Sequence, residues 1–489
     1  MSIPTDSNSR KLDPNPRLEF QWKIEPMAGA WVKSAMAAAL VDLPWTVEFA
    51  SRLEHSAGVR MIDLLDTVFL GQGSDRLQMA LDAGWIESNA VELKGQHFKG
   101  YQHPGGLFPT IAVYDDIKAN EIWLSMRVEF VADFLAANDL TRDIHGTPWA
   151  PYRYAMIEEA EGQGTFAVAE RHGRLGFSTS AGPDVLDVLE VYETFRTRLR
   201  DCKDDGEAIE HTMKLVEQGI AKIGRDYTCD RFFAAERDFW QRRNRAAQFQ
   251  KIRQDQLGMG WANHDHHTYR SSRKYFRALV ALWEMLGLHC RERFYAGIEA
   301  GWGAQVMEQP MTGIITFNDV DLSPEELTGD FSHDGLCEGD PLKTVGLWCG
   351  LHGESVTLAG MHHLEGTFNF AALRDQMESQ AGIRTMKPFT DFPFLKQAFT
   401  EGERWSVQEN RIQRLLDSKL ITLEQASYFR KEGAIGSHLE NLERNDGFKG
   451  FNQKGVSEII TATDPRLQAE KNAFEKVEYK PAEESKLHL

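Results

Sequence analysis

The chain has 489 residues, of which 42% are apolar and 10% aromatic, so it has the composition of a folded protein with more than one domain. Its formal charge of -18 argues against a nucleic-acid partner, because phosphate backbones are bound by concentrated Lys and Arg. No apolar run approaches the roughly 20 residues that cross a bilayer, and the polar start lacks a signal-peptide core. We therefore expect a cytoplasmic protein with no membrane partner.

The first part of the chain predicts an α+β domain over residues 21–183, which follows a mobile tail over residues 1–20. A helical repeat of apolar residues extends from Ala28 to about Ile86. Beyond it, four runs predict strands, and a short helix separates the first two from the last two. The strands are expected at 110–114, 122–128, 154–157 and 165–169, and the helix at 130–138.

Residues 184–257 predict a helical connector, because charged residues are interleaved there with Leu, Val, Phe and Trp. The basic run over residues 237–245 is interpreted as a solvated helix face. We expect this connector to separate the first domain from a second one that carries the candidate functional site.

Three histidines, an aspartate and an arginine fall within eight residues at the start of the second domain. The run reads Asn263-His264-Asp265-His266-His267-Thr268-Tyr269-Arg270. It is costly to bury unless each imidazole and the guanidinium finds a partner, which a metal ion or an anionic substrate would supply. The five cysteines are widely spread and never spaced as Cys-x-x-Cys, so we expect metal ligands to be His and carboxylate.

The second domain, over residues 258–465, predicts two βαβββ modules at about 258–323 and 344–465, before a surface tail over 466–489. In the first module the His run forms the first strand, and a helix ending at Gly287 precedes three more strands. These are expected at 291–296, 303–307 and 313–317. The second module has strands expected at 345–349, 355–358, 360–364, 383–386 and 438–443, and helices at 371–381 and 408–431. Two such modules can close into a half-barrel whose concave face gathers side chains from both.

The residues alone offer three pairs of alternative metal ligands, namely His264 or His266, His362 or His363, and Glu440 or Glu443. Because neighbours in a strand point to opposite faces, only one of His362 and His363 can face the cavity, and only one of the two glutamates. Two histidines and one carboxylate form the facial triad of non-haem Fe(II) oxygenases. With more ligands the set would suit Zn²⁺, Ni²⁺ or Mn²⁺ as a Lewis acid.

Three stretches between about residues 260 and 465 resemble one known family. His266 is followed four residues later by Arg270 and then by a helix; His363 stands in a His-Leu-Glu run before a helix, and Glu443 in a Glu-x-x-Glu-Arg run. In this order they resemble the metal-binding stretches of the bacterial 2-oxoadipate dioxygenase/decarboxylases, or 2-hydroxyglutarate synthases, of the vicinal-oxygen-chelate superfamily. The resemblance implies that His266, His363 and Glu443 bind Fe(2+) and that Arg270 holds a substrate carboxylate.

The reaction implied by the resemblance is the oxidative decarboxylation of a 2-oxo acid by O₂, with 2-oxoadipate giving 2-hydroxyglutarate. We expect Arg270 to pair with the distal carboxylate and Phe448 to contact the substrate. A dry wall around the iron is expected from Phe389, Phe392, Phe394, Phe448 and Phe451. Two other functions stay open, a glyoxalase-like metal-dependent isomerase or lyase and a non-catalytic small-molecule-binding protein. The identity of the 2-oxo acid and the oligomeric state also stay open.

Overall fold

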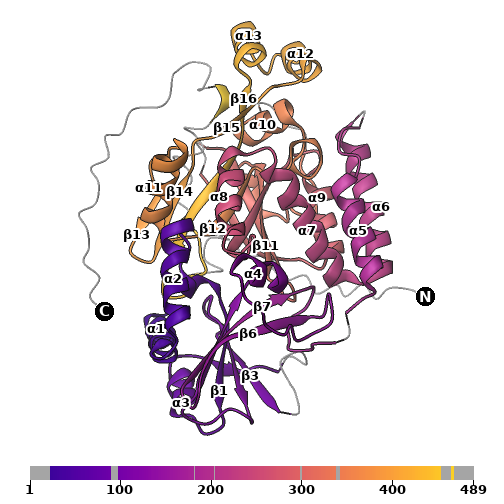
Figure 1. Cartoon of the computed structure of the whole chain (residues 1–489). Coiled ribbons are helices and arrows are strands. Elements are labelled where there is room, and N and C mark those ends of the chain that lie inside the picture. Colours follow the sequence, from indigo (N-terminus) through magenta and orange to yellow (C-terminus); the bar gives the residue numbers. More distant parts are fainter. Residues whose placement is uncertain are drawn as a thin grey trace.

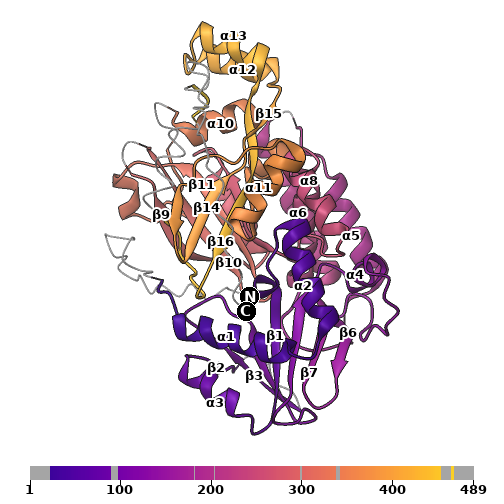
Figure 2. The same ribbon diagram turned by 60° about the vertical axis from the view of Figure 1, so that its left-hand side comes forward.

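The computed structural model describes residues 22–89, 97–180, 182–202, 204–297, 300–337, 342–452 and 464–466. The tails expected over 1–20 and 466–489 lie outside this part of the chain, except for Arg466. The strands form a seven-stranded sheet in the first half and a nine-stranded sheet in the second (Figure 1). The first sheet lies at the opposite end of the molecule from α12 (Glu409–Asp417) and α13 (Leu423–Glu432), as Figure 2 also shows. Every helix among the described residues is too short or too polar to cross a bilayer.

The first sheet contains β1 (Leu65–Gly71), β2 (Ile86–Glu87), β3 (Phe98–Gln102), β4 (Thr110–Tyr114), β5 (Ile122–Arg127), β6 (Tyr152–Ala160) and β7 (Gly164–Arg171), with α3 (Asp75–Asp82) and α4 (Val131–Ala137) as connections. Its spatial order is β2-β3-β4-β1-β5-β7-β6. The chain runs β1-α3-β2-β3-β4, and β1 pairs in parallel with β4. The run β5-α4-β6-β7 repeats this plan with one strand fewer, because β5 pairs in parallel with β7.

The prediction of helix from Ala28 to about Ile86 is wrong in its second part, because β1 lies there and forms the central strand of the sheet. The pattern does describe α1 (Pro26–Leu40) and α2 (Pro44–Ala57). β1 has no exposed residue, and a strand covered on both faces lacks the period of two that distinguishes strand from helix. The four strands and the short helix expected after it are present as β4 to β7 and α4.

Four helices join the two sheets, namely α5 (Val185–Thr197), α6 (Asp205–Ile223), α7 (Arg225–Gln241) and α8 (Arg245–Asp255). α7 contacts α5 and α6 on one side, and its Phe233 ring lies 5.1 Å from the ring of His267 on the other. The expected solvated basic face is therefore wrong at Arg237. This residue is 6% exposed, and its Nη1 lies 3.1 Å from Nε2 of His267.

The second sheet contains β8 (His264–Arg270), β9 (His289–Tyr295), β10 (Trp302–Gln309), β11 (Ile314–Asp321), β12 (His363–Thr367), β13 (Thr390–Phe392), β14 (Leu395–Phe399), β15 (Glu403–Trp405) and β16 (Ala434–Arg444), with α9 (Phe276–Met285), α10 (Thr344–His352) and α11 (Phe370–Ala381). Its order is β13-β14-β16-β12-β8-β11-β10-β9, with β15 also paired to β16. In each half the first strand, β8 or β12, pairs in parallel with the last, β11 or β16. β8 and β12 pair antiparallel at the centre. The predicted α+β class with two βαβββ modules is confirmed.

The second module begins later than expected. Residues 345–349 belong to the buried helix α10, and residues 355–358 lie in one wide helical turn, Ser355–Ala359. A short apolar run with no exposed position fits a helix as well as a strand, so the prediction of strands there was wrong. Residues 383–386 contribute only an isolated bridge at Thr385, whereas β13 and β14 were not expected.

The second sheet curves around a buried apolar cluster. The cluster combines Phe317 of β11 with Phe399 of β14, although these strands are four positions apart, which in a flat sheet is about 19 Å. Phe451 fills the space between the two halves, and its ring lies 5.1 Å from that of Phe317. The sheet therefore has a concave face, while α7 and α9 cover the opposite face.

Candidate metal centre

Four buried side chains with metal-binding atoms lie on the concave face, where the two modules join. His266 lies on β8, His363 and Glu365 lie on β12, and Glu440 lies on β16. These three strands are adjacent in the order β16-β12-β8. The most exposed of the four is His363, at 7%. Imidazole and carboxylate groups gathered in this way are a typical ligand set for a divalent transition metal.

An irregularity in β8 leaves both Asp265 and His266 opposite Glu365. Between Leu364 and Gly366 of β12, the paired residues on β8 run from His267 to His264, so β8 advances by one residue more than its partner. The extra residue makes a β-bulge, which changes the direction of neighbouring side chains. His264 and His267 lie together, with ring centroids 5.2 Å apart, and His264 is not part of the ligand cluster.

The donor atoms form two overlapping groups, Asp265 with His266 and Glu365, and His363 with Glu365 and Glu440. Nδ1 of His266 lies 3.1 Å from Oε2 of Glu365, and Nε2 of His363 lies 3.2 Å from Oε2 of Glu440. Nε2 of His363 also lies 3.6 Å from Oε1 of Glu365. Glu365 therefore connects His266 to the other two groups.

When no cation is bound, the electrostatics of the cluster favour neutral histidines and carboxyl groups that keep their protons up to about pH 7. Burial, followed by the charge of Arg444, lowers the pKa of His266 well below its usual value. Burial also lowers the pKa of His363, although Glu365 opposes this change. The pKa values of Glu365 and Glu440 both rise to about 7, mainly through burial. Neutral imidazole is the form that binds metal, and a cation would displace the carboxyl protons.

Several atoms of this cluster lack a hydrogen-bond partner. Among the described residues, both ring nitrogens of His266 and Oε2 of Glu365 make no hydrogen bond of acceptable geometry. Nδ1 of His266 and Oε2 of Glu365 still lie 3.1 Å apart as an ion-pair contact, whereas Nε2 of His266 has no hydrogen-bond partner. Buried polar atoms in native proteins are nearly always paired, so this nitrogen points to a missing partner. The residues present fit a divalent metal ion.

Neighbouring polar groups hold two of the candidate ligands in place. Nε2 of Gln397 on β14 donates to Oε1 of Glu440 at 3.0 Å, and the hydroxyl of Thr390 donates to Oε1 of Gln397 at 3.0 Å. Nδ1 of His362 lies 2.8 Å from Nδ1 of His363, which leaves Nε2 of His363 directed at the carboxyl groups. Contacts of this kind fix the orientation of metal ligands.

Arg444 and Asp265 form an ion pair beside His266. Nε of Arg444 lies 3.2 Å from Oδ2 of Asp265, and its Nη1 donates to the carbonyl of Gly450 at 2.8 Å. The other oxygen of Asp265 contacts Nδ1 of His266. Both members of the pair also line a cavity of about 790 Å³, whose other walls come from both halves of the chain and include Arg60 of the first half and His264 of the second. This cavity therefore reaches the margin of the histidine and carboxylate cluster.

Aromatic rings enclose the two candidate histidines. The ring of Phe451 lies 4.8 Å from that of His266, and the ring of Phe399 lies 4.9 Å from that of His363. Phe389 in turn lies 4.9 Å from Phe399. The rings keep the concave face apolar around the polar cluster, which strengthens electrostatic interactions within it.

Phe448, expected to bind substrate, lies away from the histidines. Its ring lies 4.9 Å from that of Phe394, and only its backbone carbonyl reaches the ion pair, accepting from Nη1 of Arg444 at 3.3 Å. Among the phenylalanines named from the sequence, Phe451 occupies the position that was expected of Phe448.

Glu443 is not brought together with His266 and His363. It follows Glu440 by three residues on one strand, so the two side chains point to opposite faces. Oε2 of Glu443 accepts from the backbone N–H of Phe370 at 2.8 Å, and its Oε1 lies 3.5 Å from Nη1 of Arg60. Glu440, the alternative that the sequence left open, lies at the cluster instead.

Arg270 lies four residues beyond His266 on β8, beside a buried acid. It is 2% exposed, and its Nε lies 3.4 Å from Oδ2 of Asp319 on β11. Burial raises the pKa of Asp319 to about 7, although the charge of Arg270 opposes this change. Nη2 of Arg270 has no hydrogen-bond partner among the described residues. Nε of Arg270 is therefore paired with Asp319, while Nη2 stays available for another anion.

The sequence reasoning missed Glu365, Gln397 and Asp319. Glu365 could have been found, because it stands two residues after His363 and must share its face of a strand. Gln397 and Asp319 carry no comparable signal, since their positions depend on how β14 and β11 pair with their neighbours.

No family model matches this sequence, and no curated protein matches it. Similar solved structures include a glyoxalase-superfamily protein of Ralstonia eutropha, with 12% identity over 53% of this chain and 94% of that chain and a TM-score of 0.30. A variant of 4-hydroxymandelate synthase from Streptomyces coelicolor has 11% identity over 84% of this chain and 98% of its own, with a TM-score of 0.24. Methylmalonyl-CoA epimerase from Mycobacterium tuberculosis has 12% identity over 37% and 88%, with a TM-score of 0.22. At these identities and TM-scores the likeness carries no inference about activity.

Proposed function

We propose that this protein is a non-haem Fe(II) dioxygenase that oxidatively decarboxylates a 2-oxo acid, with His266, His363 and Glu440 as the iron ligands. The observation that carries the proposal is the buried set itself. Two neutral imidazoles and a carboxyl group on three adjacent strands belong to two donor groups that share Glu365, on an apolar concave face, and Nε2 of His266 has no hydrogen-bond partner among the described residues. Two histidines and one carboxylate leave coordination positions open, as oxygenase chemistry requires.

The protein's own residues have distinct tasks in this proposal. Bound Fe(II) would supply the positions at which a 2-oxo acid and O₂ meet. Gln397 holds the Glu440 carboxylate through its hydrogen bond, and Phe451 and Phe399 keep water away from the histidines. The free Nη2 of Arg270 would bind a distal carboxylate of the substrate.

The substrate we favour is 2-oxoadipate. One molecule of it and one of O₂ would give one molecule of 2-hydroxyglutarate and one of CO₂, so no second organic substrate is consumed. A dianionic substrate needs a local cation in a protein of net charge -18. Arg270, Arg444 and Arg291 are cations close enough to act on His363, Glu365 or His266, and we favour Arg270 as the anchor.

Glu365 favours a second candidate function. If both Glu365 and Glu440 bound the ion, the set would comprise two histidines and two carboxylates. Fewer positions would then stay open, and a divalent ion such as Zn²⁺, Ni²⁺ or Mn²⁺ could act as a Lewis acid in an isomerase or lyase.

O₂ uptake by anaerobically Fe(II)-loaded protein tests the proposal, with 2-oxoadipate, pyruvate, 2-oxoglutarate and 4-hydroxyphenylpyruvate added in turn. We expect uptake coupled to CO₂ release with one of these acids. Glu440→Gln should abolish uptake and lower the iron content, whereas Glu443→Gln on the same strand should keep both. Absence of uptake with every acid despite bound metal would favour the isomerase or lyase. Loss of iron in Glu443→Gln but not in Glu440→Gln would reverse the ligand assignment.

A further inference from the structure

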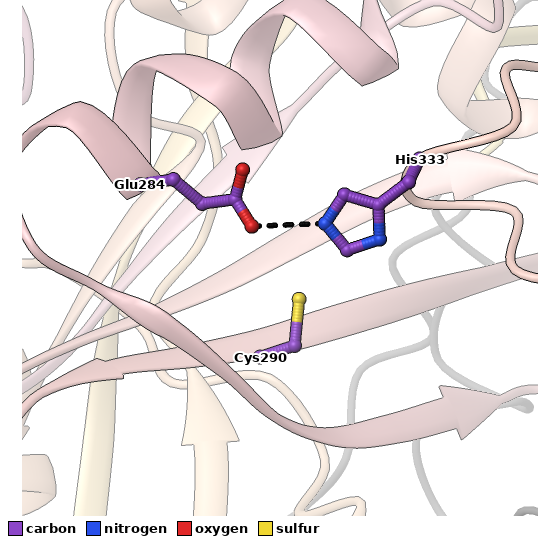
Figure 3. Close-up of side chains that lie close together, drawn as sticks. All are labelled: Glu284, Cys290 and His333. Atoms are coloured by element: carbon purple, nitrogen blue, oxygen red, sulfur yellow. Dashed lines mark hydrogen bonds and ion pairs between the residues drawn. The ribbon is translucent and has the colours of Figure 1, made fainter. Parts of the chain in front are cut away.

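A second group of metal-binding side chains lies outside the concave face. Glu284 near the end of α9, Cys290 on β9 and His333 in the loop after β11 point towards one another (Figure 3). One donor atom from each lies within 4.8 Å of the other two, and Oε1 of Glu284 lies 2.9 Å from Nε2 of His333. Cys290 packs against the core on the α9 side of the sheet, whereas the concave face has a separate apolar cluster.

The ring of His333 is oriented by contacts on its far side. Its Nδ1 lies 2.7 Å from Oδ2 of Asp330, whose Oδ1 lies 3.2 Å from Nη2 of Arg293. Nη1 of the same arginine donates to the carbonyl of Gly329 at 2.8 Å. The carboxylate of Asp330 therefore holds Nδ1 of His333, and Nε2 of the same ring faces the Cys290 thiol and Glu284. Metal-binding histidines characteristically have a carboxylate on the second nitrogen in this way.

The chemistry of the three donors suits zinc better than iron or magnesium. Thiolate, imidazole and carboxylate are the three protein ligand types of Zn²⁺, with metal–ligand distances of about 2.0–2.3 Å. Ligand atoms around a tetrahedral zinc ion are then roughly 3–4 Å apart, so small side-chain movements would close the present spacing. Burial raises the pKa of Cys290 to about 12, so without a cation the thiol keeps its proton.

We propose that Glu284, Cys290 and His333 bind a zinc-class divalent cation, with water as the fourth ligand. On binding, the Cys290 thiol gives its proton to solvent, as does Nε2 of His333 when protonated, and two metal–ligand bonds form in their place. The ion would fasten the loop that carries His333 to α9 and β9, the outer side of the first module. This site does not depend on the chemistry proposed for the concave face.

Cobalt binding tests the site, because a thiolate bound to Co²⁺ gives a charge-transfer absorption in the near ultraviolet and the concave cluster has no thiolate. Metal-stripped protein would be titrated with Co²⁺ in the wild type and in the His266→Ala/His363→Ala double variant. We expect the charge-transfer band in both proteins, and added Zn²⁺ should remove it by displacing Co²⁺. Cys337→Ser, which removes an exposed cysteine in the same loop, should keep the band, and Cys290→Ser should lose it. A band that is absent from the wild type, or that persists in Cys290→Ser, would overturn the proposal.

Two further measurements do not depend on how well Cys290→Ser folds. In the wild-type protein, Zn²⁺ should slow the alkylation of Cys290 by iodoacetamide but not that of Cys337, as read by peptide mass spectrometry. Equal rates for Cys290 with and without Zn²⁺ would overturn the proposal. Asp330→Asn should weaken Co²⁺ binding by about 10- to 100-fold, the usual effect of losing the partner of a ligand histidine. Unchanged affinity in that variant would contradict the role given to Asp330.

Discussion

Replacing Glu365 by glutamine should stabilise the metal-free protein at pH 8 and change its stability little at pH 5. In the folded protein, burial and then repulsion by Glu440 raise the pKa of Glu365 from the ordinary 4.5 to about 7. The folded state therefore holds this proton more tightly than the unfolded state. Stability contributed by the protonated form is fully present below about pH 4.5 and is lost as the pH rises through about 7.

The size of the effect follows from the two pKa values. A rise from 4.5 to about 7 corresponds to about 3 kcal/mol of unfolding free energy lost by pH 8. Glutamine carries no charge and keeps polar atoms beside His266 and His363. We therefore expect the free energy of unfolding of Glu365→Gln to exceed that of the wild type by up to about 3 kcal/mol at pH 8.

Urea unfolding of chelator-treated protein at both pH values measures this difference. Glu424→Gln, on an exposed position of α13, serves as the control and should follow the wild type at each pH. The same pH dependence in Glu365→Gln and the wild type would refute the reasoning. Added divalent metal should reverse the order of stability at pH 8, because carboxylate ligands bind metal in their ionised form.

Three further predictions concern activity and metal binding. Arg270→Ala should keep the metal but weaken binding of a dianionic 2-oxo acid by about 1.5–3 kcal/mol, as measured by calorimetry, and loss of metal would contradict its proposed role. Gln397→Leu should lower metal affinity by about 10- to 100-fold in a competition titration, since the carboxylate ligand loses its hydrogen bond, and an unchanged affinity would argue against Glu440 as a ligand. Phe451→Ala should reduce kcat/KM more than Phe448→Ala, because of these two rings only that of Phe451 lies against a candidate ligand. Equal losses in the two variants would contradict the proposal that Phe451 shields the histidines from water.

The sequence alone indicated the runs that contain His264, His266, His362 and His363, because their chemistry is unusual for a buried strand, and the resemblance to a family implied His266 and His363. The sequence alone could not choose between Glu440 and Glu443. That choice depends on which side of β16 faces the concavity, and this is set by its pairing with β12 and β14 rather than by local pattern. The bulge in β8 is equally invisible in the sequence, because nothing in a run of polar residues marks the extra position.

The βαβββ modules were predictable where strands alternate or where glycines separate them, as in β9 to β11. Prediction failed at β1 and α10, which have almost no solvent-exposed positions. Without polar positions, a buried strand and a buried helix have the same continuous apolar sequence. Which of the two forms then depends on the elements that pack against the segment. The failure at Arg237 has a different cause, because its charge in a basic run suggested a solvent-exposed residue, whereas its guanidinium makes a buried contact with His267.

The antiparallel pairing of β8 with β12 has a consequence for assembly of the chain. His266 belongs to one module, and His363, Glu365 and Glu440 belong to the other, so neither module alone contains the complete set. An ion bound by all of them would add its binding free energy to the association of the two modules. Fragments made by cutting the loop between β11 and α10 should then recombine more tightly as the metal concentration rises. The centre would thus act as a cross-link between two repeats of one structural unit.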